Sequence, residues 1–208
     1  MKSGQHARTF LLGRRMSLAK LIQQFSGVAE LPVEIPEIRD AVVNLGFQDD
    51  IIFHPEPIDP AKLRGIFYQY TLRDPPPYGD QRLCTLIVYS GVLSVDWQRV
   101  VCGKELVHVM DARVAHTRTA DETNNLLIKL LGPFSTEDFG LADFVAAKDK
   151  LALYQILPVL FPEAARKAAA SSEKTVEEIA TWACLPLPLT RLVMTDDWPA
   201  IEKEICAI

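Results

Sequence analysis

The sequence predicts an α+β protein in which a small antiparallel sheet packs against several helices. Between residues 51 and 95, short aromatic and β-branched runs are separated by turn-forming residues, as in strands and hairpins. Before and after this stretch, apolar residues recur at the three- and four-residue intervals of helices. A chain of 208 residues, 49% of them hydrophobic, can bury the core of one main domain.

Two helices are predicted ahead of the strands. The first runs from Ser17, a suitable N-cap, to Phe25, because apolar residues recur there at helical spacing. Pro36 suits the first turn of the second helix, which is expected to reach Leu45. Gly46 then suits its C-terminal cap.

Three strands are predicted at 51–53, 65–72 and 83–89. Residues 73–80 lie between the last two and contain three successive prolines, which cannot join a ladder of backbone hydrogen bonds. We therefore expect a stiff loop that joins two antiparallel strands.

A helix from Trp97 to Ala115, capped by Ser94 or Asp96, follows the strands. At roughly 100° per residue, its ionisable residues fall on one stripe and its apolar residues on another. The ionisable stripe consists of Lys104, Glu105, His108 and Asp111. It is either the solvated side of an amphipathic helix or a chemical site.

Further helices are predicted at 123–131, from 137 or 141 to 160, at 176–183, at 189–194 and at 198–208. Pro158 should kink or end the second of these. Thr175 and Glu178 have the spacing of a capping box at the start of the third.

Composition excludes several classes of protein. A net charge of -5 argues against nucleic acid as the main partner, although a basic cluster within residues 2–20 is either a local patch or a solvated tail. No apolar run approaches the ~20 residues of a membrane span, so we expect a cytoplasmic protein without a membrane partner. The four cysteines are widely spaced, as free thiols are in a reducing compartment: Cys84, Cys102, Cys184 and Cys206.

Residues 104–108 form the most informative motif, because they read K-E-x-x-H where a zinc peptidase reads H-E-x-x-H. In the peptidase motif, two histidines on one helical face hold the metal and the glutamate acts as general base. Here the glutamate and the second histidine are present, and a lysine stands in the first position.

The order of motifs resembles the ImmA/IrrE family of bacterial and phage zinc peptidases. The segments that carry the resemblance are 31–47, 63–68, 86–99, 102–108, 149–152, 159–162 and, for the tail helices, 177–195. The resemblance covers roughly residues 30 to 195 and implies a zincin-like metallopeptidase fold. It divides the chain into a tail and helix at 1–30, a metallopeptidase-like domain at 31–170 and a C-terminal helical tail at 171–208 packed on that domain.

The resemblance also implies roles for individual residues. Glu105 takes the position of the general base, His108 that of the second histidine and Asp149 that of the third zinc ligand. Lys104 takes the position of the first histidine. Asp111, one turn after His108, either orients the imidazole or pairs on the helix surface.

The lysine argues against a bound metal, so we expect no resident cofactor. A neutral amine at pH 7 needs a pKa about three units below its usual ~10.4, which costs about 4 kcal/mol. We expect instead that the Lys104 ammonium replaces the metal and pairs with Glu105, Asp111 or Asp149.

The predicted function is that of a pseudo-peptidase which acts by binding another protein, in a regulatory setting that the resemblance alone suggests. One alternative is a zinc-dependent endopeptidase with Glu105 as base. Its metal would be held by His108, Asp149 and a further ligand such as His54 or His116. A third possibility is a structural module with a vestigial groove.

Overall fold

A three-stranded mixed sheet lies at one end of the fold, and the helix that follows it runs through the core. The computed structural model describes residues 17–47, 50–73, 81–110 and 149–207. The strands are β1 (Asp50–Glu56), β2 (Gly65–Arg73) and β3 (Gln81–Ser90), and their order in the sheet is β1-β3-β2.

The sheet differs from the prediction in the direction of one strand. β3 pairs antiparallel with β2, as predicted, but it pairs parallel with β1. The prediction of a purely antiparallel sheet is therefore wrong. The apolar run at 51–53 indicates a strand but not its direction, which only the pairing of β1 with β3 shows.

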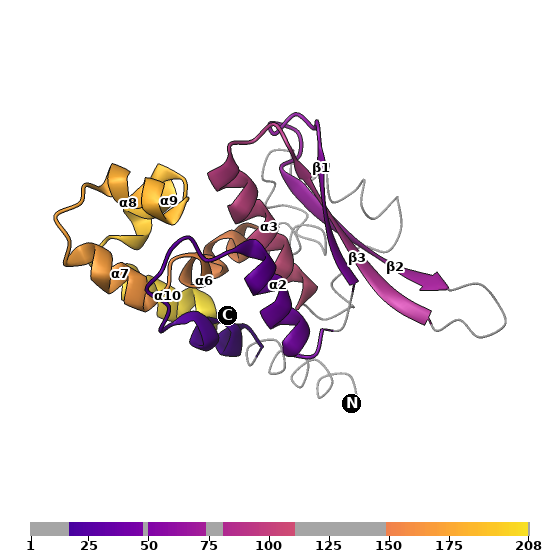
Figure 1. The fold of residues 1–208 in the computed structure, drawn as a ribbon, viewed down its shortest axis with the longest axis horizontal. Coiled ribbons are helices and arrows are strands. Elements are labelled where there is room, and N and C mark those ends of the chain that lie inside the picture. Colours follow the sequence, from indigo (N-terminus) through magenta and orange to yellow (C-terminus); the bar gives the residue numbers. More distant parts are fainter. Residues whose placement is uncertain (1–16, 48–49, 74–80, 111–148, 208) are drawn as a thin grey trace, which may run out of the picture.

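One face of the sheet packs against α3 (Val95–Val109), as Figure 1 shows. Phe53, Ile87 and Phe67 form one row across the strands, and Ile87 at its centre is fully buried. Because successive side chains alternate between faces, Ile52 and Tyr68 point away from α3. Their exposed fractions of 46% and 52% agree with that assignment.

Two helices precede the sheet where the sequence predicts them, at 17–25 and at α2 (Ile35–Asn44). Gly46 follows α2 with a positive φ of 102°, a conformation that glycine adopts without strain.

Arg99 ties the chain before α2 to α3. Its Nη2 donates to the carbonyl oxygen of Val33 at 2.5 Å, and its Nη1 pairs with Glu34 at 3.2 Å. Arg99 itself lies inside α3.

Burial of α3 is the largest departure from the sequence-based picture. Every residue from Arg99 to Val109 is buried, including the ionisable ones. The interpretation of a solvated polar stripe is therefore wrong, because other elements cover both sides of the helix. α3 begins after Ser94, as predicted; the predicted continuation beyond residue 110 lies outside the described residues.

Helices make up most of the C-terminal part. They are a segment at 149–155, α6 (Leu157–Leu160), α7 (Glu163–Ala170), α8 (Val176–Ala183), α9 (Leu187–Val193) and α10 (Trp198–Ala207). The break predicted near Pro158 falls at residue 156, and Pro158 lies in the first turn of α6. The sequence analysis missed α7. The predicted helix at 123–131 and most of the predicted loop at 73–80 lie outside the described residues.

One hydrophobic core joins the N-terminal helix, α3 and the C-terminal helices. Leu21, Leu106, Ile156 and Trp198 belong to it and are all fully buried. Within the described ranges, no helix is long and apolar enough to cross a membrane.

Candidate functional site

The C-terminal half of α3 and the helix at 149–155 bring four ionisable side chains together: Lys104, Glu105, His108 and Asp149. We call them the α3 ion cluster. Lys104 Nζ lies 2.5 Å from Asp149 Oδ1 and 2.8 Å from Glu105 Oε1. His108 Nε2 lies 3.3 Å from the same Asp149 oxygen. The expected ion pairs of Lys104 with Glu105 and Asp149 are therefore present, and the partner Asp149 lies 45 residues away in the sequence.

The α3 ion cluster is shielded from water. The exposed fractions of the side chains are 9% for Lys104, 2% for Glu105, 9% for His108 and 29% for Asp149. Burial deprives a charged group of its hydration, so the Lys104 ammonium and the neighbouring carboxylates depend on one another for compensation of charge. At the same time, exclusion of water strengthens their mutual attraction.

Lys104 is held as an ammonium. Its burial by itself lowers the pKa, but the carboxylates of Glu105 and Asp149 outweigh that effect and raise the pKa above its usual value. The shift is opposite to the one a metal ligand needs, because a ligand must offer a neutral lone pair.

Asp149 is held as a carboxylate. Burial raises its pKa, but hydrogen bonding with His108 and the charge of Lys104 lower the pKa well below its ordinary range. Asp149 thus accepts a hydrogen bond from Lys104 and lies close to His108.

Strand β2 covers the α3 ion cluster on the side of the sheet. The ring of His108 stacks on Phe67, with centroids 6.0 Å apart and planes inclined by 17°. Gly65 lies at the start of the same strand, and a Cβ there would come within 2.3 Å of Val101 Cγ1 and 3.3 Å of Glu105 Oε1. β2 therefore approaches α3 this closely only because residue 65 lacks a side chain.

Gly103 allows the segment around Ile156 to approach α3 closely on its other side. A Cβ on Gly103 would lie 2.6 Å from Ile156 Cγ1, just beyond the helix that carries Asp149. Sequence reasoning assigned no site role to Phe67, Gly65 or Gly103. For Gly65 and Phe67 the sequence contained a usable signal. Side chains alternate between the two faces of a strand, so residues 65 and 67 share the face of β2 that meets α3.

The described donor set does not fit zinc. A zinc site needs at least three protein ligands, and Asp149, one of the two predicted here, is engaged by the Lys104 ammonium. Among the residues that the structure describes, no group of three His, Cys, Asp or Glu side chains can hold a metal ion.

The structure tests one of the candidate replacement ligands. His54 pairs with Glu56 at 2.8 Å and follows Phe53 along β1, so it points to the face of the sheet away from α3. Asp111 and His116, the other residues considered, lie outside the described residues.

The geometry also argues against covalent catalysis at this site. A Schiff-base lysine must be neutral, and the carboxylates keep Lys104 charged. Cys102 is buried on the same helix, and burial together with the charge of Glu105 raises the pKa of its thiol to about 12. A thiolate nucleophile is therefore not available there at neutral pH.

No protein-family model, curated protein or solved structure matches this chain in comparisons with known proteins. The resemblance to the ImmA/IrrE family stays a prediction from the motifs.

Proposed function

We propose that this protein is a non-catalytic relative of the ImmA/IrrE-like peptidases which acts by binding another protein. One observation carries the proposal. The ammonium of Lys104, in the position of the first histidine, lies 2.5 Å from Asp149, in the position of the third metal ligand. Lys104 thus forms an ion pair with Asp149, the side chain that would otherwise bind the metal.

The ammonium supplies the positive charge that a metal would bring. Buried carboxylates need a nearby cation, and Lys104 provides one to both Glu105 and Asp149. Because the side chain is covalently attached, this compensation needs no metal supply. Glu105 is also occupied as a partner of Lys104 and is almost fully buried, which does not suit a base that activates water.

Metal analysis tests the proposal directly. Protein purified without added metal is expected to contain far less than one equivalent of zinc per chain. About one equivalent would contradict the proposal and favour the endopeptidase with an atypical site.

The substitution Lys104→His is the sharper test, since it restores the H-E-x-x-H pattern. We expect it to produce zinc binding that Lys104→Gln, the matched control without a ligand, does not produce. Adding His108→Ala to Lys104→His should abolish that binding. A folded Lys104→His variant that binds no zinc would argue against the assignment of these positions.

The binding role needs a separate experiment. A pull-down that compares the wild type with a Glu105→Gln, Asp149→Asn double variant, both checked for folding by circular dichroism, shows whether a partner depends on this region. Equal recovery by both proteins would favour a structural module with a vestigial site.

A further inference from the structure

A groove lies away from the α3 ion cluster, between the N-terminal end of α3 and the α8–α9 pair. Its volume is about 480 Å³. We call it the α3–α8 groove; the residues that matter to its chemistry are Val95, Asp96, Glu177, Ala180, Leu185 and Leu187.

The lining combines an aliphatic floor with negative charge. Asp96 and Glu177 are its carboxylates, and none of the residues that line it is a lysine or arginine. Val95 at its edge is 65% exposed, and Val92 just before α3 is exposed to the same extent. A groove of this kind favours a ligand that has an aliphatic group to bury and a positive charge for the carboxylates.

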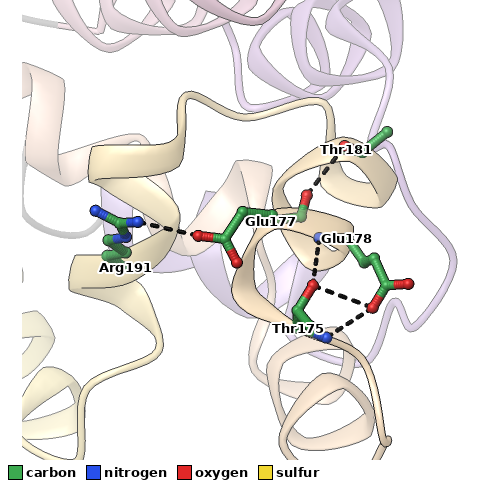
Figure 2. A network of polar contacts seen from close by, with 5 residues as sticks. All are labelled: Thr175, Glu177, Glu178, Thr181 and Arg191. Carbon is green, nitrogen blue, oxygen red and sulfur yellow. Dashed lines mark hydrogen bonds and ion pairs between the residues drawn. The ribbon is translucent and has the colours of Figure 1, made fainter.

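Such a ligand must displace one existing contact in the groove. Arg191 Nη2 lies 3.0 Å from Glu177 Oε1, and Figure 2 shows the two side chains extended toward each other from α9 and α8. Both side chains are about 60% exposed, so the pair is screened by solvent and an incoming cation can replace Arg191.

The walls of the α3–α8 groove are fixed before a ligand arrives. A complete capping box between Thr175 and Glu178 anchors the start of α8. At its other end, Cys184 adopts a left-handed conformation with φ 49° and turns the chain toward α9. A preformed wall reduces the ordering cost of binding.

The carboxylates of the groove favour a protein over a nucleic acid as the ligand. Two helices joined by a short turn, as α8 and α9 are, also occur in DNA-binding proteins. Here Asp96, Glu177 and Glu178 lie on or beside the groove, together with Lys174 in the adjoining pocket and Arg191, which pairs with Glu177. These carboxylates repel the phosphate backbone, which binds to basic surfaces.

We propose that the α3–α8 groove binds a segment of a partner protein in which an aliphatic side chain lies next to a lysine or arginine. The inference does not rest on the α3 ion cluster, because it uses different residues. It therefore stands or falls independently of the proposed loss of peptidase activity.

Selection from a library of random displayed peptides on the full-length protein tests the proposal. We expect the enriched peptides to share a basic residue next to Leu, Ile or Val. One enriched peptide, labelled with a fluorophore, then serves as the probe in anisotropy titrations. Enrichment of acidic sequences, or no shared pattern, would overturn the proposal.

Matched variants then place the peptide in the groove. Asp96→Asn and Glu177→Gln should each weaken binding by about two- to fivefold, as expected for exposed charge pairs. Glu37→Gln is the control, because Glu37 is an exposed carboxylate on α2 and does not line the groove. Equal affinities of wild type and both groove variants would contradict the proposed position.

Cys184 provides an independent readout, since it lines the same groove. A saturating amount of the peptide should slow maleimide labelling of Cys184 several-fold, measured by mass spectrometry. The thiol of Cys206, whose pKa burial raises to about 12, should stay almost unlabelled with and without the peptide, so that its labelling would report loss of structure and not binding. Unchanged labelling of Cys184, or competition by duplex DNA against the peptide, would overturn the assignment.

Discussion

Among the residues that the structure describes, the α3 ion cluster and a network around α8 use the same chemistry of paired charges in opposite surroundings. The α3 ion cluster is buried and depends on Asp149, which lies 45 residues from Lys104 in the sequence. The α8 network, drawn in Figure 2, consists of Thr175, Glu177, Glu178, Thr181 and Arg191, and its hydrogen bonds are exposed. The contrast shows that the contribution of a charge pair to stability depends more on its exposure to water than on which charged groups form it.

The two networks also differ in how a partner can be lost. In the α8 network, water takes the place of a missing partner at little cost. In the α3 ion cluster, removal of one group leaves largely buried partners without that compensation.

Lys104→Met should have the largest effect on stability. It leaves the Glu105 and Asp149 carboxylates without their cation, which typically costs about 3–5 kcal/mol of unfolding free energy. Urea denaturation measures the change. Lys62→Met is the matched control, because Lys62 is exposed and its loss should change stability by less than about 0.5 kcal/mol. Similar stabilities of the two variants would mean that the cluster is not a compensated unit.

Acid should destabilise the wild type through Asp149. Its pKa in the folded protein lies below the unfolded value of ~3.9, so its contribution is full above that pH and is lost as the pH falls. Lys104 has a raised pKa, so its contribution is full below ~10.4 and is lost only in strong alkali.

The measurement is unfolding in urea between pH 5 and pH 2. Asp149→Asn should reduce the dependence on pH by on the order of 2 kcal/mol over this range. Asp196→Asn, at an exposed position near α10, provides the control for loss of a carboxylate. A pH dependence unchanged by Asp149→Asn would contradict the assignment.

Gly65→Ala should disturb the buried network by crowding alone. The new methyl group meets Val101 at 2.3 Å, so β2 and α3 must move apart at a cost of about 1–3 kcal/mol. Gly27→Ala is the control, since a Cβ there has no atom within 4 Å. Thermal or urea unfolding should separate the two variants, and equal stabilities would show that the β2–α3 contact is looser than described.

Thr175→Ala should have the smallest effect of the four, at about 1 kcal/mol, because it removes the N-cap of α8. Thr181→Ala is a control on the same helix: its hydroxyl bonds the carbonyl of Glu177 one turn earlier, so no helix terminus loses a partner. The difference in urea midpoint between the two variants gives the value of the cap. A loss as large as that of Lys104→Met would invalidate the contrast between the exposed and buried networks.

The sequence by itself determined the features that depend on neighbours along the chain. The capping box at Thr175, the glycine after α2 and the three strands all lie where local patterns place them. These features rely on hydrogen bonds and backbone conformations that span a few residues, so spacing and residue type are sufficient to predict them. The K-E-x-x-H motif likewise drew attention to Lys104 and to an ion pair with Asp149.

Only the tertiary structure decided the direction of β1, the burial of α3 and the composition of the site. A periodic pattern shows which residues of a helix are polar, but not whether another element covers them, and here the sheet and the C-terminal helices cover the polar side of α3. Similarly, Gly65 and Phe67 acquire their roles from the approach of β2 to α3. Burial and pairing between distant segments arise from packing of the whole chain, and they turn an ordinary set of charged residues into a water-shielded ion cluster.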